Sequence, residues 1–339
     1  MKNILLFQIV FAFIFSACSD FSGNEDAVEA SLKPAPVTRN NNNNNNDDDD
    51  DTPSPRRYYD LEGIAFGNNK FVAVGKSGAD GDAVVRISSD NGSTWDNGTS
   101  GTTSTLYEIA YGNSTFVAVG DSGTHLYSRD NGGTWSTGTW SENDRVTGVA
   151  FGNNTFIGVS IYGEYVTKSV DNGSNWSKKA QGIAVYDVTY GNSKFVASGD
   201  NGAIAHSSND GENWTNGNSR TTTAYLYGIT FGNNRFLTVG SSGWLSYSSD
   251  NGSDFTALTI PLANTLYSTA YGNNIFVSVG YNSVVVSDND MSEDPILKAN
   301  SYYFNDVTFG NGVFVAVGND ENIYTSTDGD TWTKVHGKP

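Results

Sequence analysis

Short runs of apolar residues, separated by turns rich in glycine, asparagine and serine, recur along the chain between residues 58 and 339. Each repeating unit contains four such runs, and the second is the most regular, as in Phe116-Val117-Ala118-Val119-Gly120. Runs of this length, rich in Val, Phe and Tyr and bounded by turn residues, predict β-strands. No helical periodicity of apolar positions accompanies them, so the pattern predicts an all-β domain.

An aromatic-Gly-Asn phrase follows the first run of every unit and occurs seven times. Its glycines, which lie 38 to 45 residues apart, are Gly67, Gly112, Gly152, Gly191, Gly232, Gly272 and Gly310. A regular period in this range is typical of solenoids and propellers, and Gly-Asn between two apolar runs predicts a hairpin. A solenoid would need distinct capping repeats, which the chain lacks. We therefore expect a seven-bladed β-propeller of four-stranded antiparallel blades, each formed by one continuous segment.

The first run of each unit is expected to line the centre of the ring. The residue two places before each glycine is Ala or Thr, as required where blades converge. The residues four places before the glycines are Gly63, Glu108, Gly148, Asp187, Gly228, Ser268 and Asp306. If these positions border the channel, Glu108, Asp187 and Asp306 make it negative and able to hold a cation or a basic group. The alternative is that the three carboxylates accept hydrogen bonds from neighbouring backbone or from water.

A second motif, Ser-x-Asp-x-Gly-x-Thr-Trp in its fullest form, lies between the third and fourth runs. Asn209 replaces the aspartate in the fourth copy, the sixth unit lacks the motif, and the remaining copies contain Asp90, Asp130, Asp171, Asp250 and Asp328. The motif resembles the Asp-box (BNR-type) repeat of sialidases, sortilin-like receptors and photosystem II assembly-factor-like propellers. Its Ser and Asp side chains can bond turn backbone, and its Gly can adopt the left-handed conformation. Because such boxes lie on the outer part of one propeller face, too far apart to share a ligand, we expect a structural role.

The sialidase resemblance implies a particular catalytic set. Those enzymes hold a substrate carboxylate with three arginines and use a Tyr–Glu pair and an acid. Only Arg145 and Arg220 fall in the loops expected to line the pocket, and the Arg-Ile-Pro motif is absent. The three histidines lie on separate repeats without metal-ligand spacing. We therefore expect no catalysis, no cofactor and no metal site, with a glycan-binding protein or a sialidase-like glycosidase as the alternative.

Aromatic residues in the expected pocket-face loops are further candidates for a ligand site: Trp140, Tyr162, Trp244 and Tyr281. Such side chains can stack on sugars or anchor a protein partner. Trp244 fits equally well as a packing residue of a third strand. The formal net charge of −18 would repel phosphate backbones, so nucleic-acid binding is disfavoured.

The N-terminal residues predict export and a membrane anchor. Residues 1–17 contain Lys2, an apolar stretch and small residues before Cys18, the only cysteine. They resemble a bacterial lipoprotein signal peptide, in which Cys18 is lipidated after cleavage; an ordinary secretory signal that happens to contain Cys18 is the alternative. Residues 18–57, with runs of Asn and Asp, predict a disordered tether because they offer almost nothing apolar to bury.

Together these features predict a lipid-anchored propeller of the bacterial cell envelope, at the outer membrane, the cell surface or the periplasmic side. We expect residues 58–339 to act as a monomeric, non-catalytic binding or scaffolding module. Its expected partners are an envelope protein or a glycan, besides the membrane reached through the N-terminal lipid.

Overall fold

The computed structural model describes residues 59–77, 81–162, 165–182, 184–217, 223–258, 260 and 264–338. The predicted signal peptide, Cys18, the tether and Arg220 lie outside these residues. Within them the chain forms β-strands and four short 3-10 helices, and it contains no α-helix. None of the described segments is a helix of the length and apolar character needed to cross a membrane.

Most strands are short, and each 3-10 helix joins the second strand of a blade to the third. The 3-10 helices are η1 (Asp121–Gly123), η2 (Asp200–Gly202), η3 (Ser241–Gly243) and η4 (Asn319–Glu321). The strands are β1 (Leu61–Gly67), β2 (Lys70–Ser77), β3 (Ala83–Ser88), β4 (Asp96–Asn97), β5 (Leu106–Gly112), β6 (Thr115–Gly120), β7 (His125–Ser128), β8 (Ser136–Thr137), β9 (Gly148–Gly152), β10 (Thr155–Val159), β11 (Tyr165–Ser169), β12 (Ser177–Ala180), β13 (Val185–Gly191), β14 (Lys194–Gly199), β15 (Ile204–Ser207), β16 (Thr215–Asn216), β17 (Leu226–Gly232), β18 (Arg235–Gly240), β19 (Leu245–Ser248), β20 (Thr256–Leu258), β21 (Leu266–Gly272), β22 (Ile275–Asp288), β23 (Ile296–Gly310), β24 (Val313–Gly318), β25 (Ile323–Ser326) and β26 (Thr333–His336).

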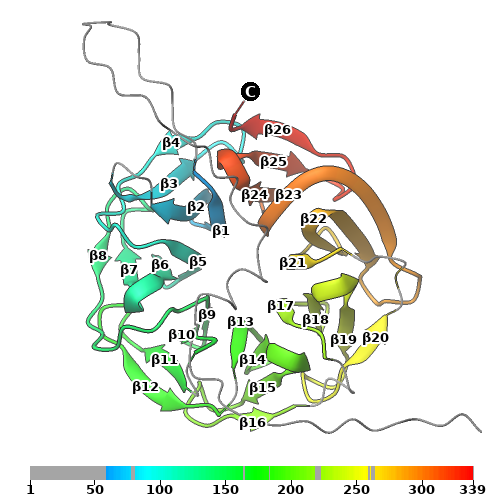
Figure 1. Cartoon of the computed structure of the whole chain (residues 1–339), viewed down its shortest axis with the longest axis horizontal. Helices are drawn as coiled ribbons and strands as arrows, with labels where there is room; N and C mark the ends of the chain where they lie inside the picture. The colour runs from blue at the N-terminus through cyan, green and yellow to red at the C-terminus, as the bar shows by residue number, and fades with distance from the viewer. Residues whose placement is uncertain are drawn as a thin grey trace, which may run out of the picture. The chain divides into compact units, whose positions relative to one another are not determined.

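The strands pair in chain order into five four-stranded sheets and one six-stranded sheet, β21 to β26. Figure 1 shows these sheets arranged as a ring, with β1, β5, β9, β13, β17, β21 and β23 innermost. Each inner strand contacts the next, and β23 contacts β1, so the ring is closed. The all-β propeller of four-stranded antiparallel blades is thereby confirmed, and the seven inner strands are consistent with the seven predicted blades.

The six-stranded sheet contains the sixth and seventh blades, because β22 and β23 each run through two predicted strands. The first half of β22 pairs with β21, and its second half pairs with the first half of β23 through Val284 and Lys298. The second half of β23 is the inner strand of the last blade and pairs with β24 through Asp306 and Val317. Asn282, with a φ of 50°, lies between the two halves of β22.

The hydrophobic core is divided among the junctions between blades. Each of seven clusters of buried side chains combines residues from two neighbouring blades, and one of them joins the seventh blade to the first. In that last cluster Val315 and Val317 of β24 pack with Phe71 of β2. Because a blade buries little apolar surface by itself, its stability depends on its neighbours.

The aromatic-Gly-Asn phrase forms a second contact at each junction. A Cβ added to Gly112 would lie 2.0 Å from the ring of Phe151 in the next blade, so only glycine fits there. The same close approach recurs at all seven glycines, and Gly310 meets Phe66 where the ring closes. The phrase therefore sets the spacing between blades as well as the turn within each blade.

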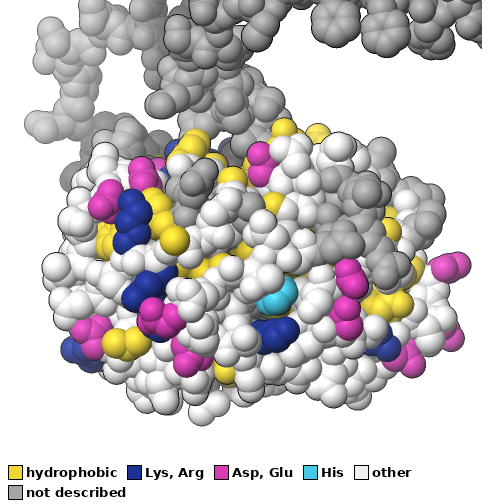
Figure 2. All heavy atoms as spheres, turned by 90° about the horizontal axis from the view of Figure 1, so that it is seen from below, with side chains coloured by type: hydrophobic (Ala, Val, Ile, Leu, Met, Phe, Trp, Pro, Cys, Tyr) yellow, Lys and Arg dark blue, Asp and Glu magenta, His cyan; other side chains and the backbone are white. Residues whose placement is uncertain are grey.

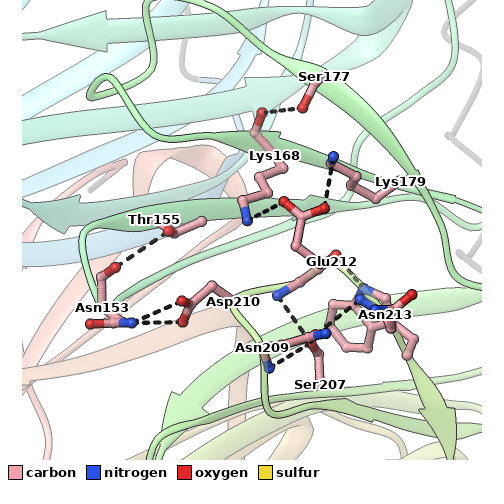
Figure 3. Close-up of polar contacts among 12 residues, drawn as sticks. Asn153, Thr155, Lys168, Ser177, Lys179, Ser207, Asn209, Asp210, Glu212 and Asn213 are labelled. Atoms are coloured by element: carbon pink, nitrogen blue, oxygen red, sulfur yellow. Dashed lines mark hydrogen bonds and ion pairs between the residues drawn. The ribbon is translucent and has the colours of Figure 1, made fainter.

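The asparagine of the phrase also reaches the next blade. Asn153 Nδ2 donates hydrogen bonds of 2.9 Å to both carboxylate oxygens of Asp210, as Figure 3 shows. The same relationship joins the hairpin of one blade to the Asp-box region of the next in four other pairs, namely Asn68 with Asn131, Asn233 with Asn289, Asn273 with Thr327 and Asn311 with Asn91. The two repeated motifs thus bind to each other across the blade junctions.

Antiparallel pairing gives the ring two different faces. The hairpins that follow the inner strands and the Asp-box turns lie on one face, which we call the turn face. The 3-10 helices and the segments that lead into the inner strands lie on the opposite face, which we call the loop face. On the side of the ring seen in Figure 2, charged side chains lie in small separate groups rather than in one patch.

Candidate functional site

A β-bulge at the start of the inner strands determines which side chains reach the loop face. In β5 the register with β6 shifts between Leu106 and Glu108, so Tyr107 falls outside the regular ladder. Five other inner strands, β1, β13, β17, β21 and β23, show the same shift. A bulge redirects the side chain of its extra residue. The extra residues are Glu62, Tyr107, Tyr186, Tyr227, Tyr267 and Asn305.

Tyrosines of the fourth to seventh blades form a continuous aromatic surface. We call it the tyrosine band, and its members are Tyr186, Tyr225, Tyr227, Tyr267, Tyr281 and Tyr303. The ring centroids lie 5.2 Å apart between Tyr186 and Tyr227 and 5.8 Å apart between Tyr227 and Tyr267. The band continues from Tyr267 through Tyr303 to Tyr281, with separations of 6.0 and 5.4 Å. Tyr225 is 38% exposed and Tyr281 is 41% exposed, so the band is accessible to a ligand.

Three phenol groups of the band, those of Tyr186, Tyr227 and Tyr267, stay neutral at physiological pH. Burial raises the pKa of Tyr186, Tyr227 and Tyr267 above the ordinary value of 10.0. The charge of Asp200 adds to this effect on the pKa of Tyr186, and the charge of Glu62 adds to it on the pKa of Tyr267. A neutral phenol offers a ligand an apolar ring and a hydroxyl that can donate or accept a hydrogen bond.

Arg145, one of the two arginines of the predicted pocket and the one that the structure describes, is already paired. Arg145 Nε donates to Asp121 Oδ1 at 2.7 Å, and the hydroxyl of Tyr107 donates to Asp121 Oδ2 at 3.0 Å. The Arg145 guanidinium also lies 5.0 Å from the ring centroid of Tyr107 and 5.9 Å from that of Tyr162, in a cation–π arrangement. Asp121 thus neutralises Arg145, which leaves it poorly suited to clamp a substrate carboxylate.

Two of the predicted channel acids, Asp187 and Asp306, are bonded to backbone. Asp187 accepts hydrogen bonds from the next nitrogen of its own strand at 2.7 Å and from Ile229 N of the fifth blade at 2.9 Å. Asp306 repeats this pattern and accepts a hydrogen bond of 2.7 Å from Ile64 N of the first blade. The hydroxyl of Ser268 also donates to Asp306. Each carboxylate therefore joins two neighbouring inner strands.

Glu108, the third predicted channel acid, has fewer partners. Among the described residues its carboxylate accepts one hydrogen bond, from Ile109 N at 2.8 Å. Burial, together with the charges of Asp306 and Asp187, raises the pKa of Glu108 well above its ordinary value of 4.5. Burial also raises the pKa of Asp187 to about 7 and that of Asp306 to about 6. The three acids are thus close enough to repel one another, but the described residues bring no three His, Cys, Asp or Glu side chains together as a metal site.

The predicted ligand aromatics Trp140 and Trp244 are partly buried at blade junctions. Trp140 packs against the core between the second and third blades, with its ring centroid 5.6 Å from that of His125. Trp244 packs against the core between the fourth and fifth blades, and its Nε1 donates to Ser246 Oγ at 3.2 Å. The other two predicted aromatics are more accessible, since Tyr281 belongs to the tyrosine band and Tyr162 is 56% exposed.

The Asp-box aspartates lie on the turn face and form hydrogen bonds within their own turns. Asp90 Oδ1 accepts from Thr94 N at 2.9 Å and from Ser88 Oγ at 2.8 Å, while Trp95 Nε1 donates to Gly92 O. The bonds from Thr94 and Ser88 lower the pKa of Asp90 to about 2. The same turn bonds occur at Asp130, Asp171, Asn209, Asp250 and Asp328. These side chains are occupied by bonds within their own turns and do not meet the loop-face residues.

Comparison with protein-family models gives no match for the chain, and comparison with curated proteins gives none. Solved structures resemble its fold. A structure described as YCF48 bound to D1 peptide is 20% identical, with a TM-score of 0.56 over 70% of this chain and 82% of the other. YCF48 from Cyanidioschyzon merolae is 17% identical, with a TM-score of 0.63 over 80% of this chain and 97% of the other. The WD40 β-propeller domain of Doa1 is 13% identical, with a TM-score of 0.61 over 80% and 93%. At these identities the likeness establishes the propeller fold alone.

Residue patterns alone do not single out the tyrosine band. Three of its members, Tyr186, Tyr227 and Tyr267, lie five places before a repeat glycine, a position that Tyr107 of the second blade shares. In an unbroken strand, side chains alternate strictly between the two faces of the sheet. The bulge interrupts that alternation at this residue, and nothing in the local sequence marks the bulge.

Proposed function

We propose that this protein is a non-catalytic binding module that holds an extended segment of a protein partner on the tyrosine band. The observation that carries the proposal is the continuity of six tyrosine rings across four neighbouring blades. Tyrosine is enriched at protein interfaces because it combines a large apolar ring with a polar tip and has few rotatable bonds. A surface of this kind suits a peptide that lies across several blades.

A structural neighbour supports a peptide ligand. The propeller described as YCF48 is bound to a D1 peptide in its solved structure. A ring of four-stranded blades can therefore present a surface to a short protein segment. For this chain we propose the same general mode of binding, with the tyrosine band as the surface and a cell-envelope protein as the partner.

The arrangement of the charged groups favours binding over hydrolysis. Arg145 is neutralised by Asp121, and the channel acids Asp187 and Asp306 are engaged by backbone nitrogens. A glycan is the second candidate ligand. The rings of Tyr225 and Tyr227 are inclined by 24° and those of Tyr267 and Tyr303 by 29°, so both pairs offer nearly parallel faces on which a sugar could stack.

The proposal includes a location at the membrane. A lipid on Cys18 would hold the propeller at the bacterial cell envelope through the segment 18–57, as a monomer. The test is the distribution of native protein and Cys18→Ala between membrane and soluble fractions. We expect the variant to leave the membrane fraction; its retention there would disprove the anchor.

The binding proposal is tested by replacing two tyrosines of the band together, Tyr227→Ala with Tyr267→Ala. Tyr247→Ala, in the fifth blade near the turn face, is the matched control. The three proteins are used to capture envelope proteins, and the captured partner is then purified for direct measurement. We expect at least a tenfold weaker affinity for the double variant, since two interface tyrosines contribute about 1 kcal/mol or more each. Equal affinities for all three proteins would contradict the proposal, and band-dependent binding on a glycan array in place of a protein would favour the second candidate.

A further inference from the structure

The second and fourth blades contain equivalent turns with different neighbours. The 3-10 helices η1 and η2 begin with Asp121 and Asp200, and the N–H of each aspartate donates to the loop before its own inner strand, at 2.9 and 3.2 Å. The bulged residue of the inner strand in the same blade is Tyr107 or Tyr186, respectively. Each blade thus places an aspartate beside a loop-face tyrosine.

The loops that lead from these two blades to the next blades also occupy equivalent positions. The third residue of η1 donates its N–H to Asp144 O at 2.9 Å, and the third residue of η2 donates to Ala224 O at 2.8 Å. The residues that come directly after these acceptors are Arg145 and Tyr225. In the second blade this position supplies a cation, and in the fourth it supplies another aromatic ring.

Because Tyr225 stands where the other loop has Arg145, Asp200 lacks the arginine that pairs with Asp121. No described residue donates a hydrogen bond to the Asp200 carboxylate, and its Oδ1 is buried. A buried oxygen of a charged group is costly to leave unsatisfied. Asp200 N donates to Ala184 O, two residues before Tyr186, at 3.2 Å, which places the start of η2 beside the tyrosine band. The ring of Tyr186 lies 6.4 Å from that of Tyr225 and 5.2 Å from that of Tyr227. Burial is the main cause of the raised pKa of Tyr186 and Tyr227, and the charge of Asp200 adds to it.

We infer that Asp200, with Tyr186, Tyr225 and Tyr227, binds an arginine or lysine side chain of the partner. The inference rests on the proposed function and names the chemistry of its ligand. The internal group formed by Arg145, Asp121 and Tyr107 shows how such a cation is held, by one carboxylate and one aromatic face. Residues 58–339 contain 28 acidic and 14 basic residues, so a basic segment would also be attracted at long range.

The experiment is a selection of randomised linear peptides on the immobilised full-length protein. We expect the selected peptides to be enriched in arginine or lysine at one position. The strongest of them is then synthesised in two forms, with the basic residue retained or replaced by glutamine. The replacement should weaken affinity about tenfold or more, because it removes a charge-assisted contact and a cation–π contact.

Three variants of the protein locate the site. Asp200→Asn should reduce the affinity for the basic peptide about tenfold and should not change the affinity for the glutamine form. Asp254→Asn, which removes the same charge from the turn face of the fifth blade, is the matched control and should bind as the native protein does. Arg220→Gln should also bind as the native protein does; a tenfold gain in affinity would mean that the chain fills the site with its own arginine and would overturn the inference.

The remaining outcomes separate this inference from the proposed function. Selected peptides that bind through the tyrosine band but contain no common basic residue, or that are insensitive to Asp200→Asn, would overturn the cation site and leave the binding module intact. A library with no enriched peptide would count against both. Melting curves of the variants show whether any loss of affinity reflects unfolding.

Discussion

Asp306 Oδ2 accepts a hydrogen bond of 2.7 Å from the backbone nitrogen of Ile64, which lies 242 residues earlier in the chain. This bond joins the seventh blade to the first. Asp187 forms the same bond with Ile229 between the fourth and fifth blades, at 2.9 Å. The last junction of the ring therefore uses a contact found at an internal junction, and no strand exchange is needed to close it.

Glu321 adds a contact that is particular to the closing junction. It is 2% exposed, accepts a hydrogen bond from Arg86 of the first blade, and lies 3.5 Å from His336 of the last strand. Its backbone nitrogen also donates to Tyr59 O at 2.8 Å. The equivalent third residue of η1, η2 and η3 is glycine, and Glu321 adopts the same left-handed φ, at 54°. A residue that suits this conformation poorly is thus present where the ring ends meet.

Replacement of Glu321 by glycine should destabilise the propeller. Glu321→Gly restores the residue of the three equivalent turns, so a loss of stability would report the missing contact with Arg86 rather than a strained turn. We expect a loss of about 3 kcal/mol, because Arg86 would be left partly buried without its partner. The contacts with His336 and Arg86 lower the pKa of Glu321, although burial raises it. The carboxylate should therefore stabilise the folded state near neutral pH, and this stabilisation should disappear as pH falls through and below the ordinary pKa.

Denaturant unfolding of native protein and Glu321→Gly, measured near neutral and acidic pH, tests this prediction. Lys298→Ala is the control, since the exposed pair of Lys298 and Asp330 should contribute less than about 1 kcal/mol. Equal stability of Glu321→Gly and the native protein at neutral pH would show that the ring closes without this contact.

Gly310→Ala should damage the same junction from the turn face. A Cβ at residue 310 would lie 2.1 Å from the ring of Phe66, which is held by its own contact with Phe71. We expect a destabilisation of about 3 kcal/mol or more, since the ring cannot move without opening the junction. Gly133→Ala is the control, because the nearest atom to its Cβ would be a carboxylate oxygen of Asp130, at 3.3 Å. If the melting temperature falls equally in the two variants, the aromatic-Gly-Asn phrase does not set the spacing between blades.

Glu108→Gln should stabilise the protein in a pH-dependent way. The raised pKa of Glu108 means that the folded state retains a proton at pH values where the unfolded state has lost it. Its contribution therefore favours folding at low pH and is lost as pH rises toward the raised pKa. Glutamine can keep the bond from Ile109 N without carrying a charge. We expect equal melting temperatures near pH 4 and a rise of about 2–4 °C in the variant near pH 8, or about 1 kcal/mol.

The control for this titration is Asp96→Asn, which removes an exposed carboxylate of β4. Its melting temperature should follow that of the native protein at every pH. If the melting temperature of Glu108→Gln also equals that of the native protein from pH 4 to pH 8, the repulsion among Glu108, Asp187 and Asp306 does not affect stability.

Asn209→Asp should strengthen the Asp-box turn of the fourth blade. Asn209 Oδ1 already accepts hydrogen bonds from Ser207 Oγ at 2.9 Å and from Asn213 N at 3.0 Å. A carboxylate would accept the same bonds with a full charge, so we expect a gain of about 0.5–1 kcal/mol at neutral pH. Because the pKa of an aspartate in this turn is lowered, as at Asp90, the gain should vanish as pH falls below about 4. Asp130→Asn should show the reverse change, and chemical denaturation of both variants checks the pair.

Much of the fold can be predicted from the sequence because the motifs that determine it are short and repeated. The aromatic-Gly-Asn hairpins, the four runs per unit and the Asp-box turns each depend on a few adjacent residues, and seven copies make the period unmistakable. The sixth unit departs from the expected turn because β22 and β23 continue where other blades have separate strands. Long-range pairing between Val284 and Lys298 accompanies that change.

The sequence by itself determined the propeller, the order of strands within each blade and the residues of the Asp boxes, since backbone conformation and strand pairing follow from short-range patterns. Only the tertiary structure decided how neighbouring blades use those residues. Gly310 needs Phe66, Asp306 needs Ile64, and the tyrosine band needs the bulges that redirect Tyr186, Tyr227 and Tyr267 in their inner strands. These contacts join residues that are one blade apart or, at the closing junction, at opposite ends of the segment that forms the ring. A short-range pattern does not determine which distant side chain a residue will contact.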